Sequence, residues 1–160
     1  MTAESDIPGP RGRRWSRAER IIATAGVLLP ADLVLLPWHR FTLDLPTQQF
    51  GVEVPSFRID RTGVQEPYAV FGIAASVIAV GMVIHVLMAR RTSAVPRPGP
   101  IHLIAGAVVL GLVAAKLLAN TDFLAIGAWV GLALAAAVAY GGFALSQEAS
   151  TGSDTAVSGA

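Results

Sequence analysis

The chain contains no cysteine and little charge, since Asp, Glu, Lys and Arg make up only 14% of its 160 residues. The absence of cysteine excludes disulfides, thiolate nucleophiles and thiolate metal sites. Hydrophobic residues make up 53% of the chain, which leaves too little polar surface to cover an ordinary water-soluble domain. The composition therefore indicates a protein that lies in lipid.

Four long apolar runs dominate the sequence, at residues 21–38, 68–89, 101–119 and 123–145. A hydrocarbon core about 30 Å thick needs roughly 20 helical residues, and each run meets that length. We therefore predict an all-α membrane protein, a four-transmembrane-helix bundle that forms one domain over 17–145. The expected helices span about 17–38, 68–90, 101–119 and 123–145, between disordered tails at 1–16 and 146–160.

Arginines are unevenly distributed among the segments outside the runs. They are concentrated in the N-terminal tail and in the linker after the second run, at Arg11, Arg13, Arg14, Arg17, Arg20, Arg90, Arg91 and Arg97. The positive-inside rule then predicts a multi-pass protein of the cytoplasmic membrane with both termini in the cytoplasm. Anionic lipid headgroups account for these arginines, so we expect no nucleic-acid partner.

Local patterns predict how several elements begin and end. Ser16 to Glu19 is a capping-box pattern that starts the first helix. The outer loop 39–67 alternates apolar and polar residues, which predicts a β-hairpin or three-stranded cap on the outer helix ends. Trp38 and Tyr68 are expected in an aromatic belt, and Thr121 or Asp122 is expected to cap the fourth helix after a tight turn.

Small residues recur at every fourth position of the last two helices. Close backbone approach through such residues is what drives helix association in lipid. We expect these stripes to pack against each other or against another helix of the bundle, rather than to form a dimer interface. The residues are Gly127, Gly131, Ala135 and Ala139 in one helix and Ala107, Gly111 and Ala115 in the other.

Asp32 and Lys116 are charged residues inside apolar runs. Counted from the outer ends of their helices they lie at similar depth, which predicts an ion pair between the first and third helices. A carboxylate at the centre of a membrane helix opposes insertion by about 2.5 to 3.5 kcal/mol. Two interpretations of Asp32, which lies beside Pro30, follow. In the first, Asp32 forms part of an ion or proton site. In the second, Asp32 is neutral or is paired with Lys116 for structure alone, while Lys116 extends towards the interface.

Met82, His85 and Met88 follow one another at three-residue steps in the second helix. Thioether and imidazole groups suit a soft cation such as Cu(I), and a neutral imidazole can also relay protons. The alternative is that the methionines fill gaps in the bundle and His85 forms a hydrogen bond to another helix. We favour this alternative and predict no resident metal or cofactor. His102, at the start of the third helix, is interpreted as an interface residue.

The order of these parts, with Leu36-Pro37-Trp38 ending the first helix and Gly127-Ala128-Trp129 near the start of the last, resembles uncharacterised small four-helix integral membrane proteins of actinobacteria. The resemblance implies no catalytic residues, and the chain has no phosphate loop or HExxH site. We expect a non-enzymatic accessory or scaffold subunit of the cell envelope. Its partners would be the lipid bilayer and other membrane proteins or a second copy. The alternative is a small transporter or channel component that uses Asp32 and Lys116.

Overall fold

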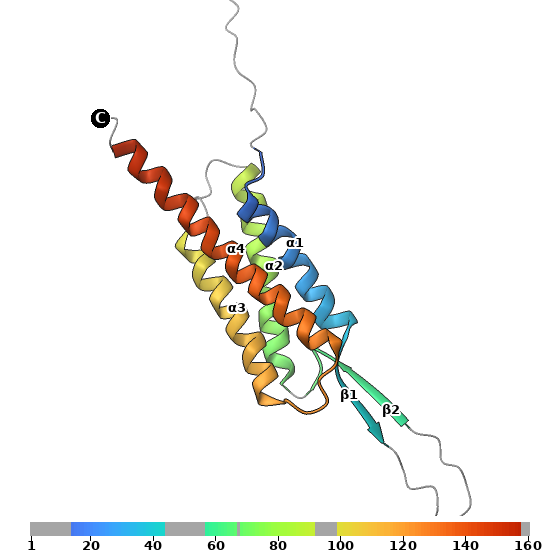
Figure 1. Ribbon diagram of the computed structural model, residues 1–160. Helices are drawn as coiled ribbons and strands as arrows, with labels where there is room; N and C mark the ends of the chain where they lie inside the picture. Colours follow the sequence, from blue (N-terminus) through green and yellow to red (C-terminus); the bar gives the residue numbers. More distant parts are fainter. Residues whose placement is uncertain (1–13, 44–56, 67, 92–98, 158–160) are drawn as a thin grey trace, which may run out of the picture.

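The computed structural model describes residues 14–43, 57–66, 68–91 and 99–157, with the backbone alone for Leu43 and for 151–157. Its four helices alternate in direction, so the start of α1 and the end of α4 lie at the same end of the bundle (Figure 1). We call this the basic end and the opposite end the hairpin end. The elements are α1 (Arg17–Leu35), β1 (Pro37–Leu43), β2 (Phe57–Thr62), α2 (Ala69–Arg91), α3 (Pro100–Ala119) and α4 (Ile126–Val157).

Three of the helices are long and apolar enough to cross a membrane: α2, α3 and α4 as far as Ser150. Large apolar side chains on their outer faces are exposed, among them Val77, Ile104 and Tyr140. A surface of this kind suits contact with acyl chains rather than with water. α1 is not among these three helices, and its 19 residues include four charged ones, Arg17, Glu19, Arg20 and Asp32.

The ends of α1 and α4 differ from the predicted ones for local reasons. α1 ends at Leu35 rather than at 38, because Leu36 precedes a proline and is extended, with φ −92° and ψ 145°. α4 begins at Ile126 rather than at 123, because the preceding segment pairs with β1. Neither Thr121 nor Asp122 is therefore in position to cap α4.

α4 also continues to Val157, through most of the segment expected to be a disordered tail. No proline follows Ile126 within the helix, and adding residues to an existing helix is easier than starting one.

The predicted capping box at the start of α1 is confirmed. The Ser16 hydroxyl accepts from the Glu19 amide at 3.1 Å, and the Glu19 carboxylate accepts from the Ser16 amide at 3.0 Å.

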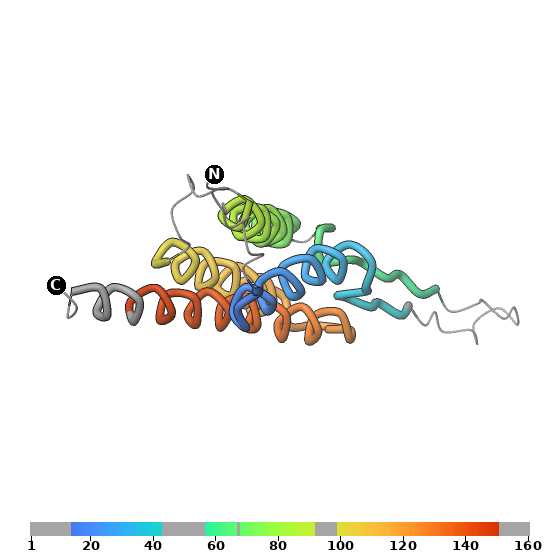
Figure 2. Tube along the Cα trace, turned by 90° about the horizontal axis from the view of Figure 1, so that it is seen from above, coloured from blue at the N-terminus to red at the C-terminus, as the bar shows by residue number. Residues whose placement is uncertain are grey.

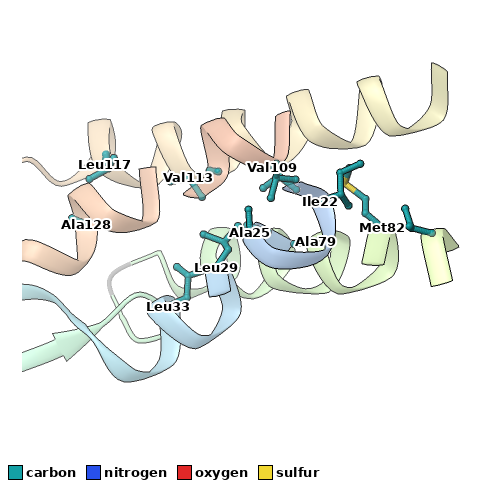
Figure 3. Packing of buried hydrophobic residues seen from close by; sticks show 14 of the residues in the cluster. Ile22, Ala25, Leu29, Leu33, Ala79, Met82, Val109, Val113, Leu117 and Ala128 are labelled. Carbon is teal, nitrogen blue, oxygen red and sulfur yellow. The ribbon is translucent and has the colours of Figure 1, made fainter. Parts of the chain in front are cut away.

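The core is a single cluster of apolar side chains from all four helices, and it includes Trp38 of β1. Figure 3 shows Ile22, Ala25 and Leu29 of α1 facing side chains of the other helices. α3 and α4 are antiparallel neighbours, as predicted. They pack closely, since a Cβ on Gly106 of α3 would lie 2.8 Å from the Cα of Ala139 of α4.

The two predicted small-residue stripes have different surroundings. On α4, Gly127, Gly131 and Ala135 are buried. On α3, however, Ala107 and Gly111 are exposed, and no atom within the described residues lies within 4 Å of a Cβ built on Gly111. The prediction that both stripes pack inside the bundle is wrong for these two residues, because α3 buries the adjacent face instead. That face carries His102, Gly106, Val109, Val113, Lys116 and Leu117.

The loop between α1 and α2 contains a two-stranded antiparallel sheet, which confirms a hairpin there. In both views the strands extend beyond the helices instead of lying on their ends (Figures 1 and 2). We call this hairpin the arm. The third expected strand, around residues 52–54, lies outside the described residues, as does Pro67, the proline expected at the start of α2.

Candidate functional site

A buried polar group lies where the arm joins the bundle. Asp32 and Trp38 are 4% and 0% exposed, and the indole Nε1 of Trp38 donates to Asp32 Oδ2 at 3.2 Å. The other carboxylate oxygen, Oδ1, is also buried and has no hydrogen-bond partner among the described residues. We call Asp32, Trp38, His39 and Lys116 the base cluster. Trp38 was predicted to lie in an aromatic belt, but it is instead a core residue.

Two glycines of α4 make room for the Trp38 ring. A Cβ on Gly131 would collide with the ring and come within 2.7 Å of Asp32 Oδ2. A Cβ on Gly127 would lie 2.7 Å from the Pro37 carbonyl oxygen and 3.0 Å from Trp38 Cδ1. The glycines at these positions of the predicted stripe therefore serve the junction between α1 and β1 rather than close packing of two helices.

Lys116 is 1% exposed and binds the loop that follows β2. Its Nζ donates to the carbonyl oxygens of Gln65 and Tyr68 at 3.3 and 3.2 Å, and the negative charge of Glu66 acts on it. Asp32 and Lys116 thus both lie at the hairpin end, but the structure gives them separate partners. Asp32 binds Trp38, whereas Lys116 holds backbone carbonyls of the loop.

His39 joins the arm to the turn between α3 and α4. Its Nε2 lies 3.4 Å from the Asn120 carbonyl oxygen, and its backbone forms a bridge with Leu124. Two backbone bonds extend this pairing: the Arg40 amide donates to Phe123 O and the Ala125 amide donates to Trp38 O, both at 2.9 Å. Burial lowers the pKa of His39, and the positive charges of Lys116 and Arg61 lower it further, against an opposing contribution from the Asn120 carbonyl.

The arm has two chemically different faces. Register pairs Phe41 with Ile59, so these residues share a face with Phe57, and Phe57 and Ile59 are 55% and 46% exposed. On the opposite face Arg40 donates to Asp60 at 3.0 Å. Every residue of β2 from Phe57 to Arg61 is exposed, so this strand is an open edge among the described residues.

A second polar group lies towards the basic end, between α2 and α3. The His85 and His102 rings are 4.9 Å apart between centroids. Both line a cavity of about 280 Å³ together with Met82. We call this cavity the histidine pocket; its other lining residues are Ile78, Gly81, Ile101 and Ala105.

The pocket contains only part of the Met82, His85 and Met88 pattern. Met82 is 4% exposed and lines the pocket, whereas Met88 is 55% exposed. Six residues turn a helix by roughly 600°, which puts the two methionines on different faces. His102, which the sequence suggested was an interface residue, is instead buried. The only sequence signal for burial of His102 was that apolar residues surround it at the start of α3.

At the basic end, α1 is joined to α2 by a buried charge pair. Glu19 Oε2 accepts from Arg90 Nη1 at 2.9 Å, and the Arg90 guanidinium lies 4.2 Å from the centre of the Trp15 ring. Glu19 is 1% exposed. The bundle is therefore joined by polar contacts near both ends of α1.

Comparison with protein families, with curated proteins and with solved structures finds no match for this chain.

Proposed function

We propose that this protein is a non-enzymatic accessory or scaffold subunit of the cell envelope, which presents the arm to another membrane or envelope protein. In this proposal all four helices cross the cytoplasmic membrane, with both termini in the cytoplasm and the arm outside. The observation that carries the proposal is the exposed apolar face of Phe57 and Ile59 on an arm that is fixed at its base.

Rigid attachment favours binding by the arm, because a surface that is already ordered loses little entropy when it docks. The base of β1 is held by Trp38 and by the 123–125 segment, and the loop after β2 is held by Lys116. Asp32 and Lys116 both take part in these contacts, which supports a structural use for them.

The apolar face favours a protein partner. Exposed aromatic and aliphatic side chains on an ordered strand are typical binding residues, and the open edge of β2 can accept a further strand. Arg58 and Arg61 on this strand would disfavour indiscriminate edge pairing.

Crosslinking from the two faces of the arm in intact cells tests the proposal. A photoreactive amino acid at Phe57 or Ile59 should give a crosslinked product of one discrete mass, whereas the same group at Arg58, on the opposite face, should not. Equal products from both faces, or no protein product from either, would contradict it. Products with lipid alone would assign the apolar face to the membrane surface and reject the scaffold role.

The proposed topology has its own test. Cysteine is absent, so single cysteines can be introduced at Ser56 in the outer loop and at Ser158 near the C-terminus. A membrane-impermeant thiol reagent applied to intact cells should label the first and not the second. Labelling of Ser158→Cys in sealed cells would reject a cytoplasmic C-terminus.

One observation favours the second candidate, a small transporter or channel component. Asp32 Oδ1 is buried without a hydrogen-bond partner among the described residues, and Asp32 lines a cavity of about 290 Å³ between α1 and α4. A carboxyl group there can hold a proton or a small cation. Proton and cation flux into vesicles that contain the purified protein tests this. Flux that Asp32→Asn abolishes would favour transport over scaffolding, and no flux would reject transport.

A further inference from the structure

The histidine pocket contains polar atoms that the fold leaves without hydrogen bonds. His102 is 2% exposed, and neither of its ring nitrogens has a hydrogen-bond partner among the described residues. Nδ1 of His85 is likewise buried and unpaired. The backbone carbonyl of Met82 faces the His102 ring, but its geometry falls short of a hydrogen bond. A buried imidazole normally has hydrogen-bond partners, so His102, with the half-buried His85 beside it, calls for a ligand.

Packing holds His102 in place. A Cβ on Gly142 of α4 would collide with the His102 carbonyl, so the backbones of α3 and α4 touch at this point. Met82 and His85 are three residues apart on α2 and therefore point from adjacent positions on one side of that helix. Side chains from two packed helices thus converge on one cavity.

The chemistry of the pocket selects a particular class of ligand. Imidazole and thioether groups are neutral and bind soft or borderline metal ions. None of the residues that line the pocket is a carboxylate or a thiolate, so nothing in it would neutralise a divalent ion. A single positive charge loses less hydration on entering such a site than a double charge. Hard cations that require oxygen ligands do not fit.

The spacing of the two rings suits a shared ion. With metal–nitrogen bonds of about 2.0 Å, two imidazoles on one ion place their ring centres roughly 5 to 6 Å apart. The observed separation of 4.9 Å lies just below this range, and the two ring planes are tilted by 33°. We infer that His85, His102 and Met82 form a binding site for a soft monovalent cation, with Cu(I) as the ion that fits best.

Titration of the full-length protein with Cu(I) tests the site. The protein, in detergent micelles without oxygen, competes with a coloured Cu(I) chelator, and we expect one bound ion per chain. His85→Gln and His102→Gln each remove a ligand, so each should weaken binding by more than the roughly 10- to 100-fold that is typical when only the outer shell of a metal site is changed. Met82→Leu should weaken it less. Met88→Leu, which changes an exposed methionine on the same helix, is the matched control and should bind normally.

A measurement on the unaltered protein guards against variants that fail to fold. X-ray absorption of the Cu(I)-loaded chain should show nitrogen and sulfur neighbours, and Met82→Leu should remove the sulfur. Binding no stronger than that of a His85→Gln/His102→Gln double variant would overturn the inference. A copper signal with oxygen neighbours only, or equal affinity for Zn²⁺, would overturn it too.

Discussion

Trp38 lies only six residues after Asp32, and its indole Nε1 donates to the Asp32 carboxylate at 3.2 Å inside the bundle. The chain leaves α1 between these residues and turns into β1, so the bond ties the last helical turn to the first residues of the arm. The position of the arm therefore depends on a contact that is buried in the helical core.

Trp38→Phe should destabilise the protein. The variant keeps most of the aromatic volume but removes the donor of Asp32 Oδ2, and an unpaired buried polar group costs about 1–3 kcal/mol. Thermal unfolding in detergent micelles measures the loss. Trp129→Phe is the control, because Trp129 is 58% exposed and should be replaceable without loss. Equal unfolding temperatures for the two variants would contradict a structural role for the bond.

Gly131→Ala and Gly111→Ala should behave differently although the change is the same. A methyl group at position 131 would collide with the Trp38 ring, and overpacking of this kind costs about 1–3 kcal/mol. At position 111 the methyl group meets no described atom, so the variant should be as stable as the parent or slightly more so. The comparison uses the midpoint of unfolding in one detergent. A similar loss at both positions would mean that helix flexibility, and not the ring, explains the glycines.

Glu19→Gln should destabilise the basic end of the bundle. Glu19 is buried and its partner Arg90 is 16% exposed in the side chain, so removing the carboxylate should cost about 2 kcal/mol. Arg90→Gln should do the same, whereas Arg91→Gln, at an exposed position, should not. The double variant of Glu19 and Arg90 should lose less than the sum of the single losses. Strict additivity would show that the two side chains do not act as a pair.

Features that depend on local sequence were predictable. The length of the apolar runs predicts the four helices, Ser16 and Glu19 predict the capping box, and the alternating residues predict a hairpin. All three features are confirmed. The starting point of α4 was not predictable, because the 123–125 segment pairs with β1, which is distant in sequence. Local patterns do not contain such pairings.

The sites were predictable only in part, for a related reason. The spacing of Met82 and His85 indicated one side of a helix, but His102 comes from another helix and has no sequence relationship to them. Asp32 and Lys116 were correctly placed near one end of the bundle, since rise per residue fixes depth. Their partners depend on the rotation of each helix and on the path of the loops, which depth alone does not determine.

The pKa of His39, lowered by burial, predicts that this residue makes the folded protein less stable in mild acid. The folded chain resists protonating this ring, so below the ordinary histidine pKa of 6.5 the unfolded chain binds more protons. Stability should therefore fall as the pH drops through 6.5 and stop falling, for this group, once the pH is below the folded-state pKa. Unfolding measured between about pH 5 and pH 8 covers this window.

His39→Gln isolates the contribution of this residue, because the amide has no charge to gain and every other titrating group is kept. The variant should lose less stability than the parent as the pH falls, although it starts from a lower value if the contact with the Asn120 carbonyl weakens. The difference between the two proteins, and not the slope of either one, reports on His39. Parallel curves across the window would show that the folded and unfolded chains bind this proton equally, which would contradict a lowered pKa of His39 at the base of the arm.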